Sequence, residues 1–272
     1  MGCPLFVVDA FTDRPFAGNP AAVCVLAGER SDAWLANVAR ELNLSETAFL
    51  RPLGNAWSLR WFTPSVEVDL CGHATLGSAH ALWEAGLADP HRPLRFETKS
   101  GPLGAVRRAG RIELDFPSEP PLAAEVPARI YEALGVSSAL WSGRNRLDYL
   151  LELESEGALR ALDPDFRALT EASLPGRGVI VTARPESKGH DFVSRYFAPA
   201  AGIDEDPVTG SAHCCLGPYW AARLDKTELS GYQASARGGT VGVRVGEGGR
   251  VTLIGQAVTV TRGELLQQAA SS

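Results

Sequence analysis

The chain has 272 residues, of which 45% are hydrophobic and 21% are charged, and this balance is typical of a globular protein and excludes a disordered one. The length allows one large domain or two lobes that each bury a core. The formal net charge of −6 at pH 7 opposes binding to a phosphate backbone, so we expect no nucleic-acid partner.

The sequence also indicates where the protein works. No apolar run approaches the roughly 20 residues that cross a bilayer, so we expect no membrane partner. The opening segment MGCPLFVVDAFTDRPF lacks the basic stretch and small-residue cleavage site of a signal peptide. The five cysteines are odd in number and two are adjacent, which is not typical of a disulfide framework. We therefore expect a cytoplasmic protein.

In the first half, patterns of apolar residues predict strands, two helices and a hairpin. The first helix is predicted to start at a Ser31 cap, and the second is apolar on nearly all sides and ends before Gly86. A turn is predicted at Ala109-Gly110 within the hairpin. The predicted elements are strands at 5–11, 21–26, 45–53 and 57–64, helices at 31–44 and 74–85, and hairpin strands within 94–117.

The second half repeats this order after a linker. Prolines at 117, 120, 121 and 127 mark the linker. The predicted elements that follow are helices at 127–134 and 212–223, strands at 178–184 and 192–199, a hairpin at 239–255 and a final strand within 257–267. We therefore predict a first lobe of residues 1–117, completed by the tail 258–272, and a second lobe of residues 118–257.

The two halves share short motifs in the same order. RWFTP at 60–64 recurs as RYFAP at 195–199, and Gly72-His73-Ala74 recurs as Gly210-Ser211-Ala212. The offsets of 195 − 60 = 135 and 210 − 72 = 138 differ by three residues, which indicates an insertion before the second helix. Chance matching of short strings is the alternative, but the constant order favours a tandem duplication. We predict an α+β fold with two similar lobes, each with strands around one buried helix.

A glycine, Gly72 or Gly210, stands at the opening of each predicted central helix, two residues before its predicted range. The start of a helix presents free N–H groups and a partial positive charge, which bind carboxylates. If a pseudo-twofold axis relates the lobes, both helix starts face one cleft, and we expect a small carboxylate-bearing substrate there. The alternative is that each glycine only caps its helix.

Four polar residues near these helix starts are candidates for catalysis or binding. Glu46 begins an apolar strand, where partial desolvation makes a carboxyl group a usable acid or base, although an exposed glutamate is the more ordinary interpretation. His73 can orient a carboxylate or move a proton, or it can cap its helix. Asp206 can hold an amine or hydroxyl group and Ser211 can donate to a carboxylate, or both can cap the second helix.

The sequence favours neither a metal nor an organic cofactor. The candidate metal ligands are Cys71, His73, His213, Cys214 and Cys215, but they lack CxxC or HxxxH spacing, so we expect no metal. The GxGxxG, P-loop and GxSxG motifs do not occur, so a nucleotide cofactor and a serine hydrolase have no support.

Four ordered segments, DAFTDRPFAGNPAAVCVL, LNLSETAFL, DLCGHATLGSAHAL and DEDPVTGSAH, resemble the PhzF-like family named for phenazine biosynthesis. The resemblance covers nearly the whole chain. It implies the diaminopimelate epimerase fold, with two lobes that each wrap a barrel-like sheet around a central helix, and a homodimer. It also implies that Glu46 is the acid/base of a cofactor-independent isomerase, similar to trans-2,3-dihydro-3-hydroxyanthranilate isomerase. His73, Asp206 and Ser211 are the implied site partners.

Two alternatives to the isomerase remain open. The related amino-acid epimerases use two cysteines as opposed bases, one before each central helix, and here Cys71 stands at the first place whereas EDPVTGS has no cysteine. One carboxyl group that moves a proton on one face therefore fits isomerisation better than inversion. The other alternative is a non-catalytic ligand-binding or interaction protein with the same fold. The motifs do not identify the substrate.

Overall fold

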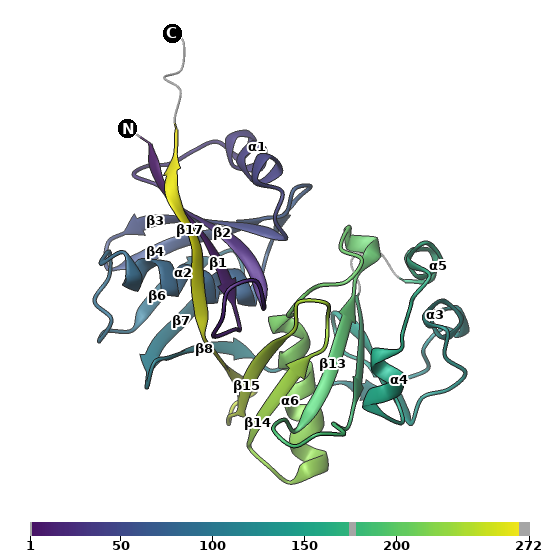
Figure 1. Cartoon of the computed structure of the whole chain (residues 1–272). Helices are drawn as coiled ribbons and strands as arrows, with labels where there is room; N and C mark the ends of the chain where they lie inside the picture. The colour runs from purple at the N-terminus through teal and green to yellow at the C-terminus, as the bar shows by residue number, and fades with distance from the viewer. Residues whose placement is uncertain (1, 174–177, 267–272) are drawn as a thin grey trace. The chain divides into compact units, whose positions relative to one another are not determined.

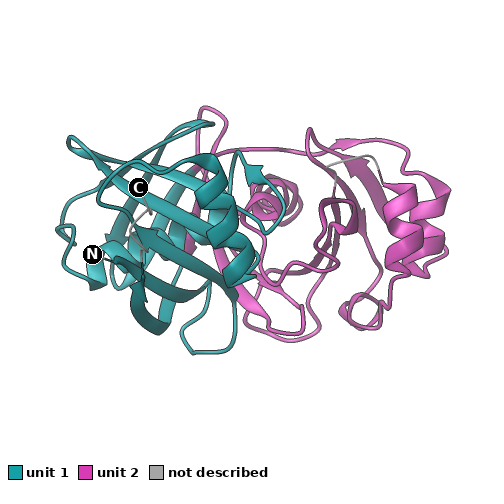
Figure 2. Cartoon of the chain, turned by 90° about the horizontal axis from the view of Figure 1, so that it is seen from above, with its two compact units in different colours: residues 1–115, 255–272 teal, residues 116–254 magenta. Residues whose placement is uncertain are grey.

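A computed structural model describes residues 2–173 and 178–266 of the chain. The contacts within the chain group these residues into two compact units (Figure 2). Unit 1 comprises the described residues of Met1–Asp115 and Gly255–Ser272, and unit 2 comprises those of Phe116–Ile254. Each unit combines mixed β-strands with few helices, so the predicted α+β class is confirmed.

Unit 1 is a mixed sheet in which a helix connects the two strands of each parallel pair along the chain (Figure 1). Its strands pair in the order β17-β1-β2-β3-β4-β6-β7-β8, with parallel neighbours at β2–β3 and β4–β6. A parallel pair needs a crossover, and the two helices supply it. The elements are β1 (Cys3–Ala10), β2 (Asn19–Val25), α1 (Asp32–Leu42), β3 (Glu46–Leu53), β4 (Ala56–Phe62), β5 (Glu67–Val68), α2 (Gly72–Glu84), β6 (Leu94–Thr98), β7 (Gly101–Arg108), β8 (Arg111–Pro117) and β17 (Ala257–Leu265).

Unit 2 repeats the same series of parallel and antiparallel pairings. Its order is β9-β10-β11-β12-β13-β14-β15-β16, with parallel neighbours at β11–β12 and β13–β14. This repetition is the topology expected of a tandem duplication. The elements are β9 (Leu122–Ala123), α3 (Ala128–Leu134), β10 (Trp141–Arg144), β11 (Asp148–Glu152), α4 (Glu156–Arg160), α5 (Phe166–Ala172), β12 (Gly178–Ala183), β13 (Phe192–Phe197), the 3₁₀ helix Pro199–Ala201, α6 (Gly210–Leu224), β14 (Glu228–Gln233), β15 (Gly239–Val245) and β16 (Arg250–Gly255).

The central helices α2 and α6 are buried, as their apolar sequences predicted. Their buried side chains include Leu76 and Leu82 in α2, and Leu216 and Trp220 in α6. Each helix begins two residues before its predicted start, because its glycine is the first helical residue. The glycines therefore sit inside the first turn, where their N–H groups can face a ligand.

The structure also contains elements that the sequence patterns did not predict. These elements, which include β10, β11, β14, α4 and α5, are short. The strands β10 and β14 each contain an internal glycine, which weakens the sequence pattern by which a strand is predicted. Helices α4 and α5 span less than the window in which helical periodicity can be read. Residues 267–272 of the predicted tail lie outside the described residues, whereas 257–265 form β17, which pairs with β1.

None of the helices in the described part of the chain is long and apolar enough to span a membrane.

Candidate functional site

The start of β3 and the start of α2 bring Glu46 and His73 together in unit 1. Glu46 is the first residue of β3 and lies beside Ala21 of the parallel strand β2. Asn19, two residues before Ala21, therefore projects from the same face of the sheet as Glu46. The first turn of α2 places His73 against both side chains, so three segments that are distant in the sequence meet at one imidazole ring.

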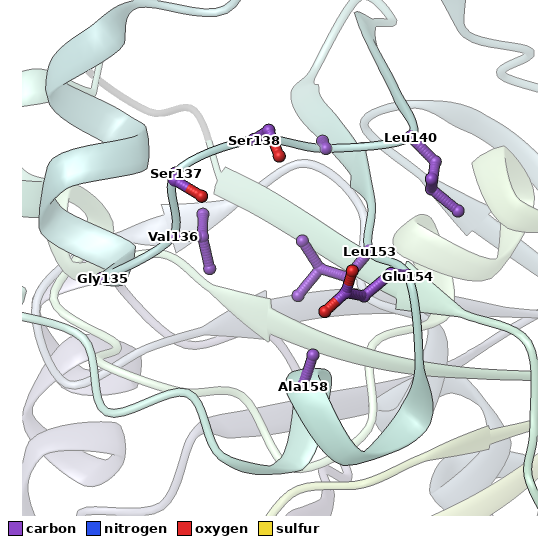
Figure 3. A pocket seen from close by; sticks show the side chains of 9 residues that line it. Gly135, Val136, Ser137, Ser138, Leu140, Leu153, Glu154 and Ala158 are labelled. Atoms are coloured by element: carbon purple, nitrogen blue, oxygen red, sulfur yellow. The ribbon is translucent and has the colours of Figure 1, made fainter.

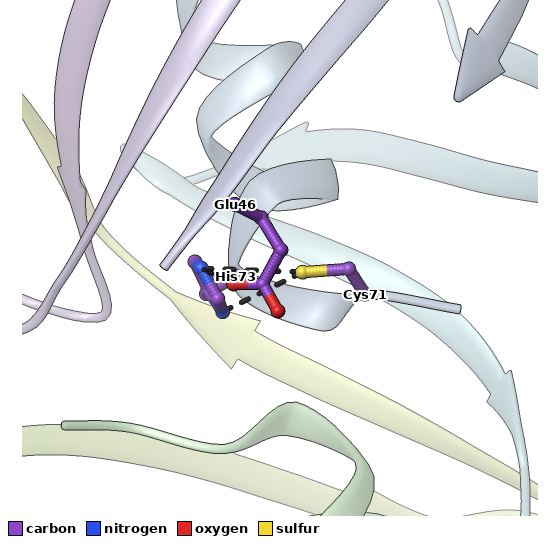
Figure 4. Close-up of side chains that lie close together, drawn as sticks. All are labelled: Glu46, Cys71 and His73. Atoms are coloured by element: carbon purple, nitrogen blue, oxygen red, sulfur yellow. Dashed lines mark hydrogen bonds and ion pairs between the residues drawn. The ribbon is translucent and has the colours of Figure 1, made fainter. Parts of the chain in front are cut away.

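The contacts at this ring are short and shielded from water (Figure 4). His73 Nε2 lies 3.0 Å from Glu46 Oε2, and His73 Nδ1 lies 3.1 Å from Asn19 Nδ2. Cys71, the residue before α2, places its Sγ 3.6 Å from His73 Nδ1. Glu46 is 8% exposed and His73 is 3% exposed, so the alternative of an exposed glutamate is wrong.

Burial and charge act in opposite directions on His73. Burial alone lowers the pKa of this imidazole, but the negative charges that Cys71 and Glu46 carry when ionised, with the hydrogen bonds to both, raise the pKa well above 6.5. Burial also raises the pKa of the Cys71 thiol, so the thiol is protonated at neutral pH. Cys71 and Glu46 are thus the two groups whose contacts favour a proton on His73.

In unit 2, Asp206 and its neighbours form a hydrogen-bonded turn at the start of α6. Thr209 Oγ1 donates to Asp206 Oδ2 over 2.5 Å. Gln233, at the end of β14, donates to the Asp206 carbonyl over 2.7 Å and accepts from the Thr209 N–H over 2.8 Å. The predicted helix cap is corrected here, since Thr209, and not Ser211, occupies the N-cap position and Ser211 is the second residue of α6.

The six predicted site residues thus fall into two groups. Glu46, Gly72 and His73 lie together in unit 1, whereas Asp206, Gly210 and Ser211 lie in unit 2. Neither Cys71 nor Thr209, the two N-cap residues, makes a side-chain cap hydrogen bond within the described residues. The first N–H groups of both central helices therefore lack the usual side-chain partner, which suits them to an anionic ligand.

Sequence analysis did not identify the ion pair that anchors each loop before a central helix. Arg60 donates to both carboxylate oxygens of Glu67 over 2.7 and 2.8 Å, and Arg195 does the same with Glu205 over 2.7 and 3.0 Å. Both arginines open the repeated RWFTP and RYFAP motifs. A glutamate stands five residues before the helix glycine in each half (72 − 67 and 210 − 205), and this shared spacing is the signal that could have revealed the pairs.

Among the described residues of unit 2, no carboxyl group takes the position that Glu46 has in unit 1. The first residue of β12, which matches β3 in the repeated topology, is Gly178. A Cβ atom at this position would lie 2.2 Å from the hydroxyl oxygen of Tyr196. Tyr196 in turn donates to Asp148 over 2.9 Å. The Tyr196 ring therefore occupies the space that a side chain at position 178 would need.

Among the candidate metal ligands, the structure brings two together and adds a third. Donor atoms of Glu46, Cys71 and His73 lie within 4.8 Å of one another. Both nitrogens of His73 already have a protein partner, Glu46 at Nε2 and Asn19 at Nδ1, so the arrangement fits a proton relay without displacing any contact. Cys214 and Cys215 are buried thiols within α6 in the other unit.

His213, in the first turns of α6, is a neutral core histidine and should make stability depend on pH. Burial lowers its pKa to about 4, so the unfolded chain takes up a proton between pH 6.5 and about 4 that the folded chain does not. The free energy of unfolding should fall by about 3 kcal/mol as pH drops through this window, since one pKa unit is worth about 1.4 kcal/mol. Urea unfolding at several pH values checks this, and His213→Gln should remove most of that slope. An unchanged slope in the variant would contradict it.

A separate surface hollow of about 270 Å³ lies beside the loop between α3 and β10 (Figure 3). Ser137, Ser138 and Glu154 line it together with apolar side chains such as Leu153. None of the predicted site residues contributes to it, and its single carboxylate is exposed. This hollow is therefore separate from the candidate site around Glu46 and His73.

Comparison with known proteins identifies the family of the chain. The sequence profile of the family described as phenazine biosynthesis-like protein matches residues 8–263. An uncharacterized isomerase of Halalkalibacterium halodurans is 55% identical over 267 residues, which cover 98% of this chain and 99% of that protein.

Solved structures are similar over the whole chain. The crystal structure of a phenazine biosynthesis protein of the PhzF family from Enterococcus faecalis has a TM-score of 0.92 and 43% identity, and covers 98% of this chain and 100% of its own. A probable proline racemase from Agrobacterium radiobacter has a TM-score of 0.67 at 12% identity, with 99% and 94% covered, and shows the shared fold alone. The predicted diaminopimelate epimerase-like fold is therefore confirmed. The chain belongs to the phenazine biosynthesis-like (PhzC-PhzF) protein family and is an enzyme of the isomerase class.

Proposed function

We propose that Glu46 moves a proton within a small carboxylate-bearing substrate, in a reaction similar to that of trans-2,3-dihydro-3-hydroxyanthranilate isomerase. The observation that carries this proposal is the buried contact of 3.0 Å between Glu46 and His73 at the start of α2. A carboxylate held out of water beside a protonated imidazole can accept a proton from carbon and return it.

The residues around this pair have complementary roles in the proposal. The N–H groups of Gly72 and the following residues bind the substrate carboxylate, and the His73 imidazolium stabilises the charge that develops during proton transfer. We assign Asp206 a catalytic role, and Gly210 and Ser211 binding roles, at the start of α6. Independence from cofactors, a cytoplasmic location and a homodimeric state are part of the same proposal and rest on family membership.

A single base accounts for the site better than two opposed thiols do. Burial raises the pKa of Cys71, which disfavours a thiolate at neutral pH. Thr209 stands where the second thiol of an epimerase would, and its hydroxyl group donates to Asp206. An alcohol is too weakly acidic to serve as the opposed base, so transfer on one face is the better-supported reaction.

The test is deuterium incorporation from D₂O into a panel of dihydroanthranilates and free amino acids, followed by proton NMR and mass spectrometry. The wild-type protein should label a dihydroanthranilate or another cyclic carboxylate, and Cys71→Ser should retain this exchange to within about tenfold, because the thiol is not the base. Labelling of amino acids with inversion, lost in Cys71→Ser, would instead establish the epimerase alternative. Binding without exchange would favour the non-catalytic alternative.

A further inference from the structure

His73 has two partners from the sheet, and the proposed function uses only Glu46. We propose that Asn19 is a positioning residue that holds the His73 ring with Nε2 toward Glu46 whether the ring is neutral or protonated. This inference rests on the proposed function for its catalytic meaning. Its physical content, the state of one imidazole ring, can be measured without any substrate.

The backbone around Asn19 is fixed on both sides. Gly18 has a φ of +65°, and a Cβ atom there would lie 2.1 Å from the Ala10 carbonyl oxygen, so this position requires glycine. Pro20 restricts Asn19 to an extended conformation, and Asn19 lies opposite Ala10 in the β1–β2 ladder. Asn19 is fully buried. Its amide group therefore has little freedom other than rotation about its own terminal bond.

A primary amide is suited to a ring that changes its protonation state. When His73 is neutral and carries its proton on Nε2, the Asn19 NH₂ group donates to Nδ1 over the observed 3.1 Å. When the ring is protonated on both nitrogens, a half-turn of the amide presents its carbonyl oxygen to Nδ1–H. In either state Nε2–H is left to donate to Glu46 Oε2.

Neither an aspartate nor a leucine can meet both states at this position. An aspartate can only accept, so it would keep a proton on Nδ1 and favour the imidazolium. A leucine of similar size would leave Nδ1 facing a methyl group and allow the ring to turn. The titratable groups that act on the ring are Glu46 from β3 and Cys71 from the residue before α2, whereas Asn19 from β2 does not titrate.

The experiment compares Asn19→Asp and Asn19→Leu by NMR of ¹⁵N-labelled protein, in which the ring nitrogens report the tautomer and the titration midpoint. The chain has five histidines, and the His73 signals are identified by their loss in His73→Gln. Asn19→Asp should shift the His73 midpoint to higher pH. Asn19→Leu should shift it lower and abolish the protected Nε2–H signal. Both variants should lose about 10- to 100-fold in deuterium exchange with whichever dihydroanthranilate of the panel the wild-type protein labels, the range typical of outer-shell partners.

Asn37→Asp is the matched control, because it makes the same substitution on the exposed face of α1. It should leave the His73 signals unchanged. An unchanged tautomer and midpoint of His73 in both Asn19 variants would overturn the inference. If Asn19→Leu fails to fold, Asn19→Asp, which differs by one group of equal size, decides alone. If Glu46 is not the base, the exchange kinetics of the Glu46 variant will show it and these NMR results will not change. The proposed function and the role of Asn19 are therefore tested separately.

Discussion

Glu46→Gln should reduce substrate-dependent deuterium exchange by about 10²- to 10⁴-fold, the usual contribution of a positioned acid or base. The amide has nearly the same shape as the carboxyl group and can still accept from His73 Nε2, so the contact of 3.0 Å should survive. It cannot take up a proton from carbon at neutral pH. The loss should therefore fall on kcat.

Binding measurements separate this chemical effect from a structural one. The affinity for 2-aminobenzoate, used as a carboxylate probe and measured by calorimetric titration, should change by less than about threefold in Glu46→Gln, because the substitution does not alter the helix N–H groups to which we assign carboxylate binding. Glu41→Gln, an exposed glutamate on α1, is the matched control and should exchange at the wild-type rate. Undiminished exchange in Glu46→Gln would remove the proposed mechanism.

Arg195→Met should lower the free energy of unfolding by about 2 to 3 kcal/mol, because it leaves Glu205 of a partly buried ion pair without its partner. The Arg195 side chain is 11% exposed and that of Glu205 is 19% exposed. Arg195 Nη1 also donates to the Leu162 carbonyl over 2.7 Å, so the substitution removes a backbone contact as well. Methionine keeps the length of the side chain and its packing near Phe197.

Urea unfolding followed by circular dichroism measures this loss, and two further variants define its origin. Arg195→Lys keeps the charge but not the two-pronged contact, so an intermediate loss is expected. Arg167→Met removes the arginine of the exposed pair with Glu171 and should cost less than about 1 kcal/mol. A cost for Arg195→Met no larger than that of Arg167→Met would show that the pair does not anchor the loop before α6.

The sequence predicted the parts of the site but not how they meet. Glu46 and His73 stood out because one begins an apolar strand and the other begins an apolar helix, and both patterns are local. Their contact depends on the parallel pairing of β2 with β3, which no local pattern specifies. Asn19 and Gln233 escaped notice for the same reason, since each acts on a residue far away in the sequence.

More of the fold than of the site could be predicted, because the sequence repeat provides the pattern of the lobe in both halves of the chain. The buried helices were evident from residues that are apolar on every side, and RWFTP with RYFAP fixed the strands before them. The first part of the second lobe was predicted least well. There β10, β11, α4 and α5 are each so short that tertiary packing, and not periodicity, decides their conformation.

The pairing of β1 with β17 has a consequence for biosynthesis. Cys3 faces Leu265 in that ladder, so the two strands are separated by nearly the whole length of the polypeptide (Figure 1). Unit 2 is continuous in sequence and can fold while it leaves the ribosome, whereas the nascent half with Glu46 must wait for β17 with one sheet edge unfinished. Unit 1 is thus completed only when the last strand of the chain is available, and until then its unpaired sheet edge is the part of the chain that chaperones would protect.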